Sequence, residues 1–181
     1  MTTPGFALFD TPIGRCGIAW SARGVVDVEL PAARDELTRA RLRKASPAAR
    51  EAMPPPRVQQ ALEAIVAVLR GEPRDLSAIP LDTHGVPTFD RQVYHVARTI
   101  PPGSTRSYGA IAAQLGDRRL ARDVGQALGR NRFPIIVPCH RVVAANGRPG
   151  GFSAPGGRHT KLRLLALEGA SPNGTLPLFA D

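Results

Sequence analysis

Hydrophobic and polar residues alternate along two stretches near the start of the chain. Residues 16–21 and 25–30 both show a period of two, and their apolar positions on one face are Cys16, Ile18, Trp20, Val26, Val28 and Leu30. This period is typical of half-buried strands, and the segment between them is typical of a turn. Residues 6–10 are expected to add a third strand. The sequence therefore predicts a small antiparallel sheet near the N-terminus.

A helical spacing of apolar residues follows the predicted sheet. The positions that recur every three or four residues are Val58, Ala61, Leu62, Ile65, Val66 and Leu69. Prolines before this segment and Gly71 after it suit the two ends of a helix. Residues 34–45 are polar and basic, which is compatible with either a short helix or a mobile loop.

The second half of the chain has the apolar spacing of shorter helices, expected at residues 89–100, 107–116, 119–131 and 160–170. Ser107 is expected to cap the second of them, and the second and third together resemble a helix-turn-helix. Gly125 and Gly129 each weaken the third helix by about 1 kcal/mol relative to alanine, which favours close approach of another backbone. The apolar run 133–143 is predicted to be β-rich, and a glycine-rich loop follows it.

Together these elements predict an α/β (α+β) protein. Glycine, proline and small polar residues gather in residues 81–88, which favours a domain boundary there. We expect a sheet-and-helix domain over residues 1–85, a mainly helical domain with the helix-turn-helix over residues 86–172, and a tail over residues 173–181. A hydrophobic fraction of 43% in 181 residues is enough for a core of ordinary size.

The apolar runs are shorter than a membrane span, and the first residues do not follow the pattern of a secretory signal. The two cysteines lie far apart and form no disulfide framework, which favours a reducing cytoplasm. We therefore expect a cytoplasmic protein that does not engage a membrane.

The positive charge of the chain gathers in its second half. The whole chain has 24 basic and 15 acidic residues. Residues 1–85 hold 11 basic and 10 acidic side chains, whereas residues 86–172 hold 13 basic and 4 acidic ones. Such a concentration suggests a polyanionic partner for the second half, with nucleic acid favoured over a mere effect on solubility.

Cys139 is the candidate for chemistry, because His140 and Arg141 follow it at the end of an apolar run. It is compatible with a packed core cysteine, a metal ligand or a nucleophile. The histidines show no paired ligand spacing, so no metal site is expected. The polar neighbours favour a nucleophile, with Glu168 orienting His140. Since neighbouring strand residues point to opposite faces, either the chain turns after Pro138 or a water bridges the two side chains.

The segment "IIVPCHRVV" resembles the active-site segment of the O6-alkylguanine-DNA alkyltransferases, also called methylated-DNA–protein-cysteine methyltransferases. "FDRQVYHVARTIPPGSTRSYGAIAAQLG", "ARDVGQALGRN" and the later "GGFS" with "EG" follow in the order of that family, so the resemblance covers residues 86–170. The start of the chain resembles the N-terminal domain of the family, of ribonuclease H-like type, more weakly.

The resemblance implies a suicide reaction. Such proteins flip an O6-alkylguanine out of double-stranded DNA and move its alkyl group irreversibly onto a cysteine, which matches Cys139 here. His140 and Glu168 match a water-mediated relay, and Asn131 matches a bracing turn asparagine. No cofactor is implied, and we expect a monomer in solution.

The resemblance also assigns contacts with DNA and with the lesion. Arg122 matches an arginine that intercalates where the base has left, and Tyr108 matches a tyrosine that helps rotate the nucleotide and donates a proton. The helix-turn-helix is expected in the minor groove, with small residues facing it. The DNA-binding set is Arg122, Tyr108, Ala121, Gly125 and Ser107. The substrate pocket is expected to comprise Pro138, Val142, Phe152 and Ser153, whereas Arg141 is interpreted as structural.

Three features depart from the family pattern. Ala154 and Pro155 form an apparent insertion beside the pocket, Asp123 stands next to the expected intercalating arginine, and Cys16 lacks partner ligands for a metal. Two other functions stay open, namely a damage sensor that binds without transfer and a cysteine hydrolase. The presence of Cys139 argues against the sensor, and the sequence shows no oxyanion hole for the hydrolase.

Overall fold

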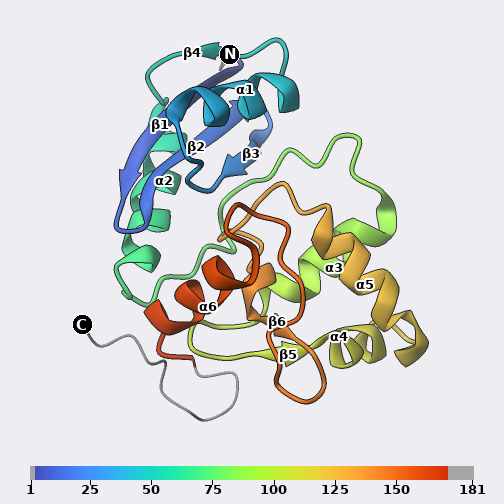
Figure 1. Cartoon of the computed structure of the whole chain (residues 1–181). Helices are drawn as coiled ribbons and strands as arrows, with labels where there is room; N and C mark the ends of the chain where they lie inside the picture. The colour runs from blue at the N-terminus through green and yellow to red at the C-terminus, as the bar shows by residue number, and fades with distance from the viewer. Residues whose placement is uncertain (1–2, 171–181) are drawn as a thin grey trace.

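The computed structural model describes residues 3–170 and confirms the predicted α+β class (Figure 1). The strands are β1 (Gly5–Thr11), β2 (Gly14–Ser21), β3 (Gly24–Glu29), β4 (Arg50–Glu51), β5 (Arg106–Ser107) and β6 (Val142–Val143). The helices are α1 (Asp35–Ala45), α2 (Pro56–Leu69), α3 (Thr88–Arg98), α4 (Tyr108–Gln114), α5 (Ala121–Gly129) and α6 (Gly157–Leu167), with the short 3-10 helices η1 (Arg118–Leu120) and η2 (Cys139–Arg141). The expected tail 173–181 lies outside the described residues.

The N-terminal sheet is the predicted antiparallel meander with one added strand. Its order is β3-β2-β1-β4, and β4 runs parallel to β1. The pairing of β2 with β3 shifts, so that Ala19 opposes Asp27 while Trp20 opposes Val25. The extra residue is Val26, and this bulge reverses the alternation. The prediction that Val26 shares a face with Val28 is therefore wrong, because Val25 takes that place.

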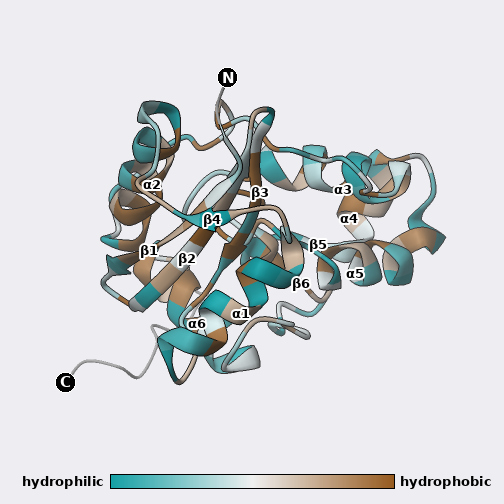
Figure 2. Ribbon diagram, turned by 90° about the horizontal axis from the view of Figure 1, so that it is seen from above, coloured by the Kyte–Doolittle hydropathy of each residue, from teal (hydrophilic) through white to brown (hydrophobic). Residues whose placement is uncertain are grey.

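Helices α1 and α2 cover opposite faces of this sheet (Figure 2). Leu62 and Ile65 of α2 pack with Ile18 in one cluster of buried side chains, whereas Leu42 of α1 packs with Ala19 in another. The polar segment 34–45 is thus a helix rather than a loop, since it needs only a narrow apolar stripe to dock.

The C-terminal part is built from the predicted helices. The Ser107 hydroxyl accepts a hydrogen bond from the Ala110 N–H at 3.1 Å, so it caps α4 as expected. Gly125 and Gly129 do not meet another backbone within the part of the chain that the structure describes. A Cβ on Gly125 would lie 3.8 Å from the Tyr108 ring, and one on Gly129 would face open space. The two glycines therefore leave one side of α5 flat.

Residues 133–141 do not form the predicted β-rich run. Pro134 and Pro138 have no N–H to give to a strand ladder, and Ile135 adopts a left-handed conformation with φ of 72°. The Val137 N–H donates to the Phe133 carbonyl at 2.8 Å, which closes a turn. Only β6 is extended, and it pairs in parallel with β5.

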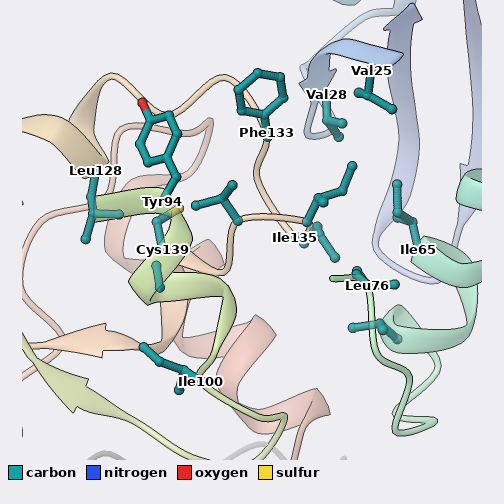
Figure 3. Close-up of a cluster of buried hydrophobic side chains, with 14 of the residues drawn as sticks. Val25, Val28, Ile65, Leu76, Tyr94, Ile100, Leu128, Phe133, Ile135 and Cys139 are labelled. Carbon is teal, nitrogen blue, oxygen red and sulfur yellow. The ribbon is translucent and has the colours of Figure 1, made fainter. Parts of the chain in front are cut away.

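One hydrophobic core runs through both halves of the molecule. Figure 3 shows Val28 and Ile65 of the N-terminal half beside Phe133 and Ile135 of the C-terminal half. The Val28 N–H also donates to the Arg132 carbonyl at 2.8 Å, so β3 is fastened to the segment that precedes Cys139. No helix among residues 3–170 is long and apolar enough to cross a membrane.

Candidate active site around Cys139

The chain turns at Pro138. Cys139 and His140 can therefore contribute to one site although they are adjacent in the sequence. The Cys139 N–H donates to the Val137 carbonyl at 2.8 Å, and the Arg141 N–H donates to the Pro138 carbonyl at 2.9 Å. In the resulting 3-10 helix η2, consecutive side chains lie about 120° apart around the axis, rather than on opposite faces as in a strand.

Asn131 braces the loop that leads to Cys139. Its side-chain amide donates to the Val137 carbonyl at 2.9 Å, and its side-chain oxygen accepts from the Phe133 N–H at 2.9 Å. The bond from the Phe133 N–H gives this group the partner that a strand ladder would otherwise supply, and the Val137 carbonyl accepts from both Asn131 and Cys139. The bracing role of Asn131 stays a prediction, and these two bonds are the contacts that it would use.

Some features of the surroundings of Cys139 raise the pKa of its thiol and others lower it. The residue is 8% exposed, and burial raises the pKa of its thiol. Asn131, the Lys161 ammonium and the backbone N–H groups of Cys139 and His140 act in the opposite direction. The site therefore keeps a thiol at rest while offering groups that stabilise a thiolate once the proton leaves.

His140, Arg141 and Glu168 form a closed network behind the sulfur. His140 Nε2 lies 2.9 Å from Glu168 Oε1, and Arg141 donates to both oxygens of Glu168 at 2.9 and 2.7 Å. Arg141 also donates to the Ile100 carbonyl at 2.6 Å. Burial alone would raise the pKa of Glu168, but the bonds from His140 and Arg141 lower it to about 2. Glu168 is therefore a carboxylate hydrogen-bonded to the imidazole, and Arg141 is bound within the same network.

His140 has one ring nitrogen left for chemistry. Burial lowers the pKa of the imidazole, so the neutral ring donates from Nε2 to Glu168 and keeps Nδ1 as an acceptor. Nδ1 is buried and has no hydrogen-bond partner among the described residues. A neutral, oriented imidazole with a spare acceptor is suited to take a proton from the neighbouring thiol.

Lys161 is a member of the site that sequence reasoning missed. It is fully buried on α6, and Nζ donates to the Val142 carbonyl at 2.5 Å and lies 3.4 Å from the Tyr108 hydroxyl. Burial lowers its pKa to about 8. A signal was present, because Lys161 is one of only two lysines beside 22 arginines, the other being Lys44.

A groove of about 800 Å³ opens above Cys139. It is lined by residues of the helix-turn-helix region, which include Tyr108, Ala121, Arg122, Gly125 and Leu128, and by residues of the glycine-rich loop, which include Phe152 and Ser153. Arg122 is exposed at this groove and has no ion pair within the described part of the chain. The groove joins an acceptor sulfur, a phenol, a hydroxyl and a free guanidinium in one open space.

Comparison with known proteins decides the family. A model described as "6-O-methylguanine DNA methyltransferase, DNA binding domain" matches residues 88–170. A methylated-DNA–protein-cysteine methyltransferase of Methanothermobacter thermautotrophicus is 33% identical over 163 residues, covering 90% of this chain and 84% of the relative. The chain belongs to the 6-O-methylguanine DNA methyltransferase family.

Further relatives of this methyltransferase family support the same conclusion. The Mycolicibacterium paratuberculosis protein of the same name is 44% identical over 119 residues, covering 66% of this chain and 70% of the relative. The crystal structure of Mycobacterium tuberculosis O6-methylguanine methyltransferase superimposes with a TM-score of 0.73 at 32% identity, over 98% of this chain and 99% of that one. The Mycobacterium tuberculosis OGT in complex with DNA gives a TM-score of 0.70 at 32% identity, covering 91% and 92% of the two chains.

Most residues expected from the methyltransferase resemblance meet at the site. Three of them lie elsewhere. Pro138 lines a separate cavity of about 570 Å³ behind η2, and Val142 is buried, with its carbonyl bound to Lys161. Ser107 caps α4 and does not line the groove. The Pro138 and Val142 carbonyls and the Ser107 hydroxyl each accept a hydrogen bond from within the fold.

Proposed function

We propose that this chain repairs DNA by moving an alkyl group from the O6 atom of guanine to its own Cys139, once per molecule. Alkyl transfer from DNA to a protein cysteine is the activity of this family of methyltransferases. The O6-guanine lesion, the identity of the acceptor and single use are the parts that we add. The observation that carries them is the opening of the groove onto Cys139, beside Tyr108 and Ser153.

The proposed chemistry is a single displacement at carbon. The Cys139 thiol gives its proton to His140 Nδ1 through one water, and the thiolate attacks the alkyl carbon bound to O6. The carbon–sulfur bond forms as the carbon–oxygen bond breaks, and the electron pair of that bond passes to the purine, which takes a proton. Burial and the nearby Cys139 raise the pKa of Tyr108, so its phenol stays protonated and can donate.

The product explains why no turnover follows. A thioether on Cys139 has no leaving group that water can displace readily, so the sulfur keeps the carbon. The protein then lacks its nucleophile and is consumed by one lesion.

Access to the lesion requires the base to leave the helix. Flipping a base costs a few kcal/mol, and the exposed guanidinium of Arg122, at the rim of the groove, can fill the space that the base leaves. Ala121 and Gly125 keep the adjoining surface of α5 low enough for the minor groove. The partner that we propose is double-stranded DNA carrying O6-alkylguanine.

Intact-mass measurement after mixing with a duplex that carries O6-methylguanine tests this function. A gain of one methyl, mapped by peptide digestion to Cys139, is expected. Binding with no gain in mass would instead favour a damage sensor, and release of many product molecules per protein would favour a cysteine hydrolase.

We also propose that the chain acts as a monomer in which residues 1–85 and 86–172 are two domains joined across one shared hydrophobic core. All the groups assigned above to the reaction come from one chain, so no second copy is needed to complete the site. Light scattering of the free protein and of its complex with a short duplex tests this directly. A stable dimer in the absence of DNA would contradict it.

A further inference from the structure

Asp123 differs from the other acidic residues of the second half, because the fold gives its carboxylate no partner. Residues 86–172 hold four acidic residues. Three of them are held in ion pairs, namely Asp90 with Arg130, Asp117 with Arg119 and Glu168 with Arg141. Asp123 is exposed, and its side chain has no hydrogen bond or ion pair among residues 3–170. An unpaired carboxylate therefore remains on the surface of α5.

Asp123 lies on the outward strip of α5, next to Arg122. The exposed residues of this helix are Arg122, Asp123, Gln126 and Gly129, whereas Val124, Ala127 and Leu128 are buried. Arg122 lines the groove above Cys139 together with Ala121 and Gly125, and Asp123 does not. Successive residues of a helix are about 100° apart around its axis. Asp123 therefore follows Arg122 on the side away from the groove.

This position brings Asp123 beside base pairs that stay in the helix when the lesion leaves it. In the proposed complex, Arg122 fills the space of the flipped base and α5 lies in the minor groove. Neighbouring Cα atoms are about 3.8 Å apart, and successive bases of a strand are about 3.4 Å apart. Asp123 therefore comes within about two base pairs of the lesion.

A carboxylate distinguishes base pairs in the minor groove. A G·C pair presents the guanine N2 amino group there as a donor, whereas an A·T pair presents only the acceptors adenine N3 and thymine O2. A carboxylate can only accept hydrogen bonds. Asp123 can therefore gain a hydrogen bond from G·C, and it meets only other acceptors at A·T.

The same contact gives a reason for an acid on a surface that binds DNA. Phosphates repel a carboxylate, so the charge of Asp123 weakens binding to every sequence. A hydrogen bond from a guanine amino group offsets this repulsion only where a guanine is present. A negative charge in the first turn also favours α5 itself. That effect does not depend on the sequence of the DNA, so the two roles can be separated.

We infer that Asp123 accepts a hydrogen bond from the N2 amino group of a guanine near the lesion, and that it makes G·C the preferred neighbouring base pair. The inference rests on the proposed function and narrows its substrate to lesions in G·C-rich surroundings. The alkyl carbon still passes from O6 to Cys139, and no bond of that step changes. Asp123 determines specificity and takes no part in the chemistry.

Duplexes that differ in single amino groups test the inference. Each carries one O6-methylguanine, and the two base pairs on either side of it are all G·C, all inosine·C, all A·T or all diaminopurine·T, with both orientations of each pair included. Inosine is guanine without the N2 amino group, and diaminopurine is adenine with one. We expect the wild type to react about tenfold faster with the two duplexes that carry the amino group, as one hydrogen bond to a charged group allows. The measurement is the second-order rate constant of methyl transfer.

Two substitutions of Asp123 and one control complete the test. Asp123→Ala should bring the four rate constants within about twofold of one another, because it removes both the acceptor and the repulsion. Asp123→Asn should also lose most of the preference, since an amide offers a donor as well as an acceptor. Asp10→Ala is the matched control, because Asp10 is an exposed carboxylate of β1, outside α5, and it should keep the tenfold preference.

The outcomes separate the two proposals. If the wild type takes no methyl from any duplex, the proposed function fails, and titration of the same four duplexes still measures the contact of Asp123 as a ratio of affinities. Equal values for the guanine and inosine duplexes, or a preference that survives in Asp123→Ala, would overturn the inference alone. A preference for G·C and inosine·C alike over A·T would also overturn it. That result would indicate the cytosine N4 amino group of the major groove as the donor.

Discussion

The chain holds two buried cysteines with different surroundings. Cys16 lies in β2, and burial raises its pKa to about 11, with a single opposing contact to the Thr11 hydroxyl 3.7 Å away. Burial also raises the pKa of Cys139, but Asn131, Lys161 and two backbone N–H groups oppose it, and the groove above it opens to the sulfur. Burial alone therefore does not distinguish a core cysteine from a reactive one. The reactive cysteine is distinguished by polar groups that stabilise its thiolate and by a cavity that opens to its sulfur.

Replacing each cysteine in turn should give the largest difference. Cys139→Ala should abolish alkyl transfer while keeping affinity for DNA, because the groove contacts come from α4, α5 and their neighbours. Cys16→Ala should keep full transfer and lose about 1–2 kcal/mol of stability through the small cavity it leaves. Intact mass and duplex-binding titrations measure both. Loss of binding in Cys139→Ala would contradict the separation of docking from chemistry.

A substitution of Glu168 should give the next largest effect. Glu168 holds the hydrogen-bond network with His140 and Arg141, and Cys16 has no such network beside it among the described residues. Glu168→Gln removes the negative charge that His140 and Arg141 share, so Arg141 becomes a buried and unpaired cation. We expect transfer to slow by about a hundredfold, the scale of a lost general base. The free energy of unfolding should fall by about 3 kcal/mol.

Single-turnover rates and denaturant unfolding, measured on the same Glu168→Gln protein, separate these two effects. Glu63→Gln is the matched control, because Glu63 lies on the surface of α2 and hydrogen-bonds only to the neighbouring Gln59 among the described residues. A variant that loses stability but reacts at the normal rate would show that Glu168 is structural only.

The sequence predicted some features of the fold and of the site and not others, depending on whether the feature follows from local sequence. The apolar pattern located β1 to β3 and α2 to α6, but it left α1 open between a helix and a loop and did not predict β4 or β5. The Ser107 cap followed from its residue type. Residues 133–141 were misread because Ile135, Ile136 and Val137 are typical of strands, while the consequence of Pro134 and Pro138 depends on tertiary bonds from Asn131. The strand propensity of a residue takes no account of such hydrogen bonds from other parts of the chain.

The burial of Lys161 and the faces of Val25 and Val26 were missed for other reasons. Lys161 stands in an apolar helical pattern where a lysine reads as a surface residue, and only the fold shows that it is enclosed. The faces of Val25 and Val26 depend on the bulge at Val26, which shifts the period by one residue and cannot be placed from alternation alone. Both errors concern which side of an element a residue faces.

Arg122 tests the opening above Cys139, a feature that Cys16 lacks. Arg122→Ala should slow transfer from duplex DNA by about tenfold or more, on the scale of a flipped base that costs a few kcal/mol to hold outside the helix. Reaction with the free base O6-methylguanine should change by less than about twofold, since no stack has to be filled. Arg91→Ala is a control for charge alone, because Arg91 lies on α3 and outside the groove. Equal slowing with both substrates would argue against a flipping role.

Replacing Lys161 should have the smallest effect on the rate of transfer. It tests whether the charge of Lys161 stabilises the thiolate of Cys139. Its ammonium lowers the pKa of Cys139, so Lys161→Met should raise that pKa and move the pH profile of transfer to higher pH. At pH 7 the rate should fall by about tenfold or less, which corresponds to one pKa unit or less. In the wild type, the stabilisation of the Cys139 thiolate by Lys161 should weaken above about pH 8, where Lys161 loses its proton.

The matched control for Lys161 is Lys44→Met, since Lys44 is the other lysine of the chain and lies exposed on α1. It should leave the pH profile unchanged. Lys161 also donates to the Val142 carbonyl, so a lower rate by itself would be ambiguous. A profile of Lys161→Met that is lowered at every pH without shifting would assign this lysine to packing. A shift toward higher pH would show that its charge reaches the sulfur, a form of support that the surroundings of Cys16 do not provide.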